Sequence, residues 1–248
     1  MKVLLLAAGY ATRLYPLTID QPKPLLSVAG KPVIEFILEL IEPIKEVDEI
    51  FIVTNEKFYT HFEKWNKKYN SSKKIVIVND KTTTNKNRLG ATGDIDFVVK
   101  GKGLKDDLLV LAGDNIFRTD LTGFIKFSLS KRPSATIGLY DVGDIELSKK
   151  YGIVSLDETK KITEFREKPK KPASTLAAKC LYFFPKERLG RVKEYLSSGA
   201  SEDAPGYFLE WLSKKEDMFG YVFKDERWFD IGDMTSYKEA DRYFRKEK

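Results

Sequence analysis

The chain has 248 residues, enough to bury a full hydrophobic core as one large domain or two small ones. Its 43 basic and 37 acidic residues give a net charge of +6, without the dense basic stripe typical of nucleic-acid binding. The single cysteine, Cys180, and the single histidine, His61, leave almost no material for a disulfide, a zinc site or a catalytic triad. The N-terminal apolar run ends at Gly9, too short for a signal segment or a membrane span. We therefore expect a cytoplasmic protein with neither nucleic-acid nor membrane partners.

Strands and helices alternate along the first half of the chain. Apolar and β-branched runs predict strands at 2–8, 49–54, 74–79 and 107–112, and helical spacing predicts helices at 33–44, 58–69 and 91–100. This alternation predicts an open, mostly parallel sheet with helices on both faces. Ligands bind beyond the carboxyl ends of such strands, where the loops after Ala8 and around Asp114 are expected.

The second half of the chain is more mixed. Strands are expected at 135–140, 151–156, 161–166 and 177–184, joined by turns, with helices at 186–197, 206–214 and 235–245. No proline- or serine-rich linker separates the halves. We therefore expect one α/β domain over 1–248, with a parallel half at 1–130 and a partly antiparallel extension at 131–248.

The densest chemical signal is the loop that follows the first strand. Gly9 would let the backbone approach a bulky anion closely, and Arg13 offers a fixed fork of donors for phosphate oxygens. Lys23 stands between two prolines that limit where its ammonium can point. The spacing is neither G-x-G-x-x-G, whose later glycine positions hold alanine and leucine here, nor a P-loop. Because G-x-G-x-x-G is the dinucleotide-binding fingerprint of dehydrogenases, its absence argues against a dehydrogenase.

The whole string resembles the sugar-1-phosphate nucleotidyltransferase family, which includes glucose-1-phosphate thymidylyl- and uridylyltransferases. The family opens roughly with L-A-A-G-x-G-T-R-L-x-P-L-T, then P-K-P-L-L and G-K-P. This chain has counterparts at 6–18, 22–26 and 30–32, in that order. One departure is Ala11, which stands where the family has its second glycine and narrows the allowed backbone angles. The match is strong over roughly the first third of the chain and thins afterwards.

The resemblance implies a Rossmann-like, GT-A-like fold whose second half binds the sugar phosphate. It implies an enzyme that joins a nucleoside triphosphate (dTTP, UTP or CTP) to a sugar 1-phosphate and releases pyrophosphate. Arg13 would grip the triphosphate and stabilise charge on the transferring phosphorus, and Lys23 would neutralise the reacting phosphates. The expected nucleotide-binding residues are Leu6, Ala8, Gly9, Asn87 and Gly90.

Two aspartates are candidates for binding Mg²⁺, which such a reaction needs because it brings several negative charges together. Asp114 follows the apolar run 108–112. Asp230 lies in a W-x-D-x-G segment, and the resemblance implies that it shares the metal with Asp114. Asp233 is a rival, but it precedes the helix expected at 235–245 and suits that helix's N-cap. If Asp114 and Asp230 lay far apart in space, the proposed chemistry would have no centre.

The sugar side resembles the family at Glu167-Lys168-Pro169. The resemblance implies that Glu167 bonds sugar hydroxyls, that Lys168 binds the sugar's phosphate, and that Gly152 lets the sugar lie on the backbone. Further on, Cys180 replaces a glycine of the family, and 205–212 stands where thymidylyltransferases carry E-I-T-D. These departures leave the sugar pocket and any homo-oligomeric contacts open.

Two other functions compete with this interpretation. A non-catalytic regulatory subunit of the same fold would usually lack the loop arginine or lysine, yet Arg13 and Lys23 are both present. A glycosyltransferase that consumes nucleotide sugars would need a metal-binding D-x-D, and Asp94-Ile95-Asp96 has that form. That triplet falls inside an expected helix rather than at a strand end, which argues against it. The identity of the base and of the sugar stays open.

Overall fold

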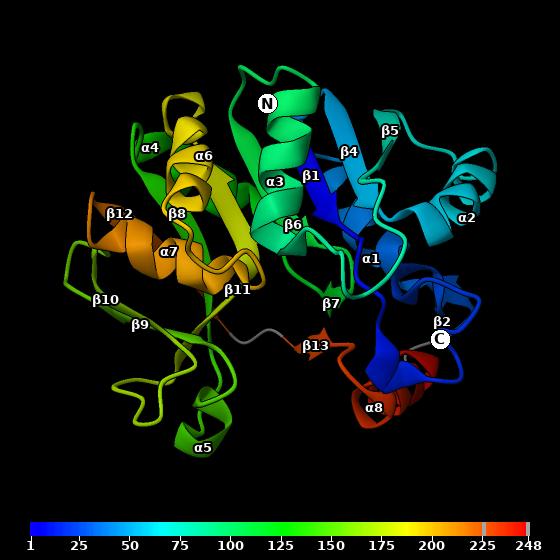
Figure 1. Cartoon of the computed structure of the whole chain (residues 1–248). Helices are drawn as coiled ribbons and strands as arrows, with labels where there is room; N and C mark the ends of the chain where they lie inside the picture. The colour runs from blue at the N-terminus through cyan, green and yellow to red at the C-terminus, as the bar shows by residue number, and fades with distance from the viewer. Residues whose placement is uncertain (225–226, 247–248) are drawn as a thin grey trace. The chain divides into compact units, whose positions relative to one another are not determined.

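The computed structural model describes residues 1–224 and 227–246 (Figure 1). These residues form two compact units that interleave along the chain. Unit 1 contains the described residues of 1–2, 90–111 and 122–224, and unit 2 contains those of 3–89, 112–121 and 227–246. The segment from residue 227 onward belongs to the same unit as the first loop.

The sheet of unit 2 is built from the expected strands. β1 (Lys2–Leu6), β4 (Glu49–Thr54) and β5 (Lys74–Asn79) follow one another across the sheet, and β4 and β5 are parallel. Helix α1 (Val33–Ile41) buries five apolar side chains. Helix α2 (Glu56–Asn66) is capped by Asn55, whose side chain accepts the Phe58 N–H. Chain order and apolar spacing therefore suffice to place these elements.

A second part of unit 2 joins the C-terminus of the chain to its beginning. Strands β7 (Asn115–Phe117) and β13 (Trp228–Asp230) pair antiparallel, as do β2 (Ser27–Val28) and β3 (Lys31–Pro32). The 3-10 helices η1 (Thr12–Leu14) and η2 (Lys23–Leu25) lie in the first loop. Helix α8 (Met234–Lys246), red in Figure 1, packs on β2.

One apolar cluster holds this part together. It joins residues of the first loop to residues near the C-terminus: Leu14, Leu26, Val28, Ala29, Val33, Ile116, Ile231, Ala240 and Phe244 are all buried in it. Burial of apolar surface is the main favourable term in folding, so this cluster fixes where the C-terminal strand and helix lie.

Unit 1 has the mixed sheet expected for the second half. Strand β11 (Leu176–Phe184) pairs antiparallel with β6 (Leu108–Ala112), β8 (Ala135–Asp141) and β9 (Gly152–Leu156). β10 (Ile162–Glu167) is antiparallel to β9, and β12 (Met218–Phe223) is parallel to β8. The remaining elements are α3 (Gly90–Gly101), α4 (Leu121–Ser130), α5 (Ile145–Ser148), η3 (Lys186–Arg188), α6 (Gly190–Ser197) and α7 (Pro205–Ser213).

The predicted class is confirmed: an α/β protein with a parallel sheet and a partly antiparallel extension. The elements that the sequence did not predict include helix α4 and strands β7, β12 and β13. β7 and β13 have three residues each, too few to show a period, and they form only against each other. Helix α4 contains Gly123, which weakens its helical signal. Over the described residues, none of the helices combines the length and apolar character needed to cross a membrane.

Candidate active site

The loop after β1 borders a pocket of about 350 Å³ within unit 2. The pocket is lined by Leu6, Ala7, Gly9, Tyr10, Ala11, Thr12, Arg13, Lys23, Pro24, Asn85, Arg88 and Asp114. Five of these residues were predicted from the sequence: Leu6, Gly9, Arg13, Lys23 and Asp114. A Cβ added to Gly9 would meet no atom within 4 Å, so the space above this glycine is open. The loop therefore has room for a ligand at the point where a phosphate cradle was expected.

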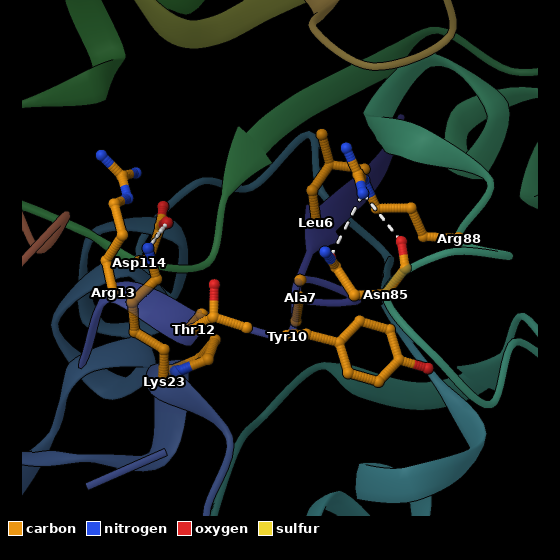
Figure 2. A pocket seen from close by; sticks show the side chains of 12 residues that line it. Leu6, Ala7, Tyr10, Thr12, Arg13, Lys23, Asn85, Arg88 and Asp114 are labelled. Atoms are coloured by element: carbon orange, nitrogen blue, oxygen red, sulfur yellow. Dashed lines mark hydrogen bonds and ion pairs between the residues drawn. The ribbon is translucent and has the colours of Figure 1, made fainter. Parts of the chain in front are cut away.

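Opposite charges meet inside the pocket. The ammonium of Lys23 forms an ion pair with Asp114, and the two side chains are only 13% and 26% exposed. Figure 2 shows Arg13, Lys23 and Asp114 together on one side of the pocket, with Asn85 and Arg88 on the other. Partial burial strengthens such an interaction relative to one in open water.

A close backbone approach brings Asp114 to the end of β1. The N–H of Gly113 donates to the carbonyl of Leu6 at 2.8 Å. A Cβ at Gly113 would stand 3.0 Å from that carbonyl oxygen, tighter than ordinary packing allows. Glycine at this position therefore lets the aspartate follow directly after the strand and still face the first loop.

The pairing of β7 with β13 places Asp230 beside Asp114. Asp230 is the direct cross-strand partner of Asn115, and the N–H of Ile231 donates to the carbonyl of Asp114 at 3.2 Å. At Gly232, a Cβ would stand 3.7 Å from Oδ1 of Asp230 and 3.9 Å from Nη2 of Arg13. The structure thus brings both predicted metal ligands to the part of unit 2 that holds Arg13.

Asp233 has a structural role of its own. Its Oδ1 accepts the N–H groups of Thr235 and Ser236, each at 2.9 Å, at the start of α8. The hydrogen bonds from Ser236, from both its N–H and its hydroxyl, and the N–H of Thr235 lower the pKa of Asp233, and the charge of Arg13 adds to this. Asp233 is therefore the helix cap that the sequence indicated, which leaves Asp230 as the second metal candidate.

The loop between β5 and α3 contributes residues that the sequence did not identify. Asn85 and Arg88 line the pocket, and Nη1 of Arg88 donates to the carbonyl and the side-chain oxygen of Asn85 at 2.7 and 3.3 Å. Asn87, which was predicted to bind nucleotide, instead accepts the N–H groups of Thr83 and Thr84. The sequence does not show which of Asn85, Asn87 and Arg88 faces the pocket, because the direction of each side chain depends on how the loop folds.

Two other predicted nucleotide-binding residues have clear local contacts. The carbonyl of Ala8 accepts the side-chain amide of the buried Asn55 at 2.8 Å, which ties the first loop to the start of α2. Gly90 lies in unit 1 with φ +74°, and a Cβ there would overlap the carbonyl of Glu202. The N–H of Ala91 also donates to the carbonyl of Asp203. Packing of 202–203 on α3 thus accounts for the glycine.

The predicted sugar-binding residues form a cluster within unit 1. Glu167 is the cross-strand partner of Gly152, and its carboxylate is 7% exposed, 3.8 Å from the ammonium of Lys168. A Cβ at Gly152 would stand 2.8 Å from this carboxylate, and one at Gly206 in α7 would overlap it. The buried carboxylate therefore occupies space that exists only because both positions are glycine.

Glu210 holds the backbone of this cluster. Its Oε2 accepts the N–H of Glu167 at 3.0 Å, while Lys214 and Arg166 offset its charge at 2.8 and 3.7 Å. Burial raises the pKa of Glu167, the charge of Lys168 opposes this rise, and the charge of Glu210 adds to it. Gly206 and Glu210 were not predicted, because they reach Glu167 only through the packing of α7 on β10.

Comparison with known proteins identifies the family. The model described as nucleotidyl transferase matches residues 2–247. The chain belongs to the nucleotidyl transferase family. This finding confirms the family expected from the first-loop motifs.

Two relatives show how far the similarity extends along the chain. It is 32% identical to a UTP–glucose-1-phosphate uridylyltransferase of Synechocystis sp., over 98% of this chain and 63% of that protein. It is 28% identical to a bifunctional protein GlmU of Methanocaldococcus jannaschii, over 98% of this chain and 54% of that protein. The chain therefore spans only part of the length of these relatives.

A solved structure shares the fold. A protein from Bacillus anthracis described as a glucose-1-phosphate thymidylyltransferase, crystallised with sucrose, superposes with a TM-score of 0.84. The superposition covers 99% of this chain and 95% of that one, at 23% identity. At this identity the likeness establishes the fold.

The residues of the pocket after β1 suit a hard divalent cation. Within 1–224 and 227–246, no three histidine, cysteine, aspartate or glutamate side chains gather as a metal-binding group. Mg²⁺ does not need such a cage, since it usually takes one or two carboxylates and completes its shell with phosphate oxygens and water. The carboxylate of Asp114 already faces a cation, the ammonium of Lys23. The donor set therefore fits magnesium better than zinc.

The first loop carries backbone strain at Ala11, which adopts φ 48° in the left-handed region while its carbonyl accepts the Thr18 hydroxyl. That conformation costs an L-residue about 1–2 kcal/mol, whereas glycine adopts it freely. We expect Ala11→Gly to leave the free energy of unfolding unchanged or higher, measured by urea denaturation. Ala91→Gly, in helix α3, is the control and should lose roughly 0.5–1 kcal/mol. Equal losses in both variants would contradict the strain at Ala11.

The fit between α7 and the buried carboxylate can be tested at Gly206. A methyl group there overlaps Glu167, so Gly206→Ala should lower stability by about 1–3 kcal/mol and lower the melting temperature. Gly101→Ala, at the end of α3, is the matched control because its methyl group would meet no atom within 4 Å. The control should be neutral or stabilising. Identical melting temperatures for the two variants would show that Glu167 does not pack on α7 as described.

The burial of Glu167 predicts a pH-dependent stability. Its folded pKa lies above the unfolded value of about 4.3, so its ionisation destabilises the folded state as pH rises through the folded pKa. Glu167→Gln should therefore be more stable than the parent near neutral pH, and this advantage should vanish below about pH 4. Urea denaturation across this pH range measures it. Glu164→Gln, at an exposed ion pair on the same strand, is the control and should show no such advantage.

Proposed function

We propose that this nucleotidyltransferase joins a nucleoside triphosphate to a sugar 1-phosphate and releases pyrophosphate, with Mg²⁺ as its cofactor. The observation that carries the proposal is the register of β7 with β13, which puts Asp230 next to Asp114 in the unit that holds Arg13 and Lys23. Phosphoryl transfer needs positioned cations more than covalent chemistry, and this group of side chains supplies them.

The triphosphate is assigned to the pocket of unit 2. Arg13 would donate its fork of N–H groups to the phosphate oxygens, and Lys23 would offset their charge. Asp114 and Asp230 would hold the magnesium ion, which when bound offsets the triphosphate's charge and polarises its oxygens. Asn85 and Arg88, on the opposite side of the pocket, are assigned to the nucleoside, with Leu6 and Gly9.

The sugar 1-phosphate is assigned to the cluster of unit 1. Glu167 would accept hydrogen bonds from sugar hydroxyls, and Lys168 would pair with the sugar's phosphate. Gly152 would contribute its backbone to the sugar site, while the space of its missing side chain is filled by Glu167 and Phe165. In the reaction, an oxygen of the sugar phosphate attacks the α-phosphorus in line. The bond from the α-phosphorus to the bridging oxygen then breaks, and pyrophosphate leaves with that electron pair.

Two similar proteins support this substrate class. The Synechocystis relative is a glucose-1-phosphate uridylyltransferase, and the Bacillus anthracis structure is described as a glucose-1-phosphate thymidylyltransferase. The glycosyltransferase alternative gains nothing from the structure, because Asp94-Ile95-Asp96 lies within α3 and Asp94 is buried. The regulatory-subunit alternative likewise gains nothing from it, since Arg13, Lys23 and Asp114 share one pocket.

The test is pyrophosphate release from mixtures of Mg²⁺, each nucleoside triphosphate and a panel of sugar 1-phosphates. With the active pair, Asp114→Asn and Asp230→Asn should each lower kcat on the order of 100-fold, because each removes a carboxylate from the cation site. Asp233→Ala is the matched control: it removes the helix cap, costs about 1 kcal/mol of stability and should keep kcat. No release from any pair, or full turnover by Asp230→Asn, would overturn the proposal.

A further inference from the structure

A second pocket lies within unit 1, where the end of α3 packs beside the start of α6 (Figure 1). Its volume is about 460 Å³. Small-molecule sites in proteins typically measure about 300–1,000 Å³. The lining comes from 96–105, at the end of α3 and just before β6, and from 186–193, just after β11. None of its described lining residues belongs to the pocket of unit 2 or to the cluster around Glu167, so the proposed function makes no use of this cavity.

Positive charge dominates the lining of this second pocket. Its charged side chains are two carboxylates, those of Asp96 and Glu187, and four ammonium groups. The ammonium groups belong to Lys100, Lys105, Lys186 and Lys193. Nη2 of Arg132, which is not part of the lining, donates to both oxygens of Glu187 at 3.0 and 3.1 Å. The charge of Glu187 is therefore offset from outside this lysine pocket, and the excess of positive charge remains.

The four lysines of the lysine pocket form no ion pair with a carboxylate among residues 1–224 and 227–246. Other lysines of unit 1 do form such pairs: Lys149 lies 2.6 Å from Glu146, and Lys214 lies 2.8 Å from Glu210. Like charges around one cavity repel each other, which lowers the stability of the folded state. A bound anion would remove this repulsion, and an ammonium group is a common binding partner of phosphate.

The uncharged part of the lysine pocket is apolar. Val99, Leu104 and Leu189 contribute side chains to it. A Cβ at Gly190, the first residue of α6, would meet no atom within 4 Å, so the backbone there is open to a ligand. The start of a helix favours negative charge. Inorganic phosphate alone would leave the apolar side chains in contact with water, whereas a phosphate that carries a carbon skeleton would cover them.

We propose that the lysine pocket binds a small organic phosphate, at a site separate from those assigned to the triphosphate and to the sugar 1-phosphate. Its ammonium groups pair with the phosphate oxygens, and its apolar side chains contact the carbon skeleton. The inference does not depend on the proposed function, because it uses none of the residues assigned there.

The experiment titrates phenyl phosphate and inorganic phosphate into the full chain by isothermal titration calorimetry. Phenyl phosphate should bind more tightly, because its ring covers the apolar side chains. In Lys100→Gln/Lys193→Gln the Kd for phenyl phosphate should rise about tenfold, since two of the four ammonium groups are gone. The control Lys67→Gln/Lys68→Gln removes the same charge from exposed lysines of unit 2 and should keep the parent's Kd.

Two further measurements keep the result unambiguous. The melting temperature of Lys100→Gln/Lys193→Gln without ligand should not fall, because the change relieves repulsion, so weaker binding would not reflect unfolding. Arg13→Gln alters the pocket of unit 2 and should leave the lysine-dependent binding of phenyl phosphate at the parent's Kd.

Three results would each overturn the proposal. One is binding that is lost in Arg13→Gln but kept in Lys100→Gln/Lys193→Gln, which would assign the anion to the pocket of unit 2. The second is an equal change of Kd in the lysine-pocket variant and in Lys67→Gln/Lys68→Gln, which would show an effect of net charge alone. The third is no binding of phenyl phosphate to the parent at millimolar concentrations.

Discussion

The short pairing of β7 with β13 is the contact on which the candidate site depends. Three residues of each strand are involved, yet their register decides which side chain stands next to Asp114. A slip of one residue would turn Asp230 to the other face of the pair. Such a short ladder cannot hold its register alone, and the buried Ile116 and Ile231 supply the remaining constraint by packing with Leu14 of the first loop. Hydrophobic packing thus positions a charged site.

The charged residues of the two candidate sites have different surroundings. In unit 2, Asp114 is balanced by Lys23, and both groups keep some access to water. In unit 1, the carboxylate of Glu167 is buried against two glycines and lies 3.8 Å from the ammonium of Lys168. The first arrangement is a charge pair, whereas in the second the burial of the carboxylate raises the pKa of Glu167. A buried carboxylate of this kind is costly to the fold, and such costs are common where function requires them.

Glycine and alanine positions in the first loop and after β6 meet different backbone constraints. Gly9 has open space where a Cβ would stand, whereas Gly113 is required by a close carbonyl. Ala11 occupies the left-handed conformation that the family's glycine would adopt without strain. The hydroxyl of Thr18, which donates to the carbonyl of Ala11, helps to hold the loop in this conformation.

The sequence by itself determined the α/β class, the loop with Arg13 and Lys23, and the capping role of Asp233, because each depends on local spacing or on a contiguous motif. Only the tertiary structure decided the rest. It joined Asp230 to the neighbourhood of Asp114, and it turned Asn85 rather than Asn87 into the pocket. It also packed α7 on Glu167. These are contacts between segments far apart in the chain, or directions within an irregular loop, and neither leaves a period in the sequence.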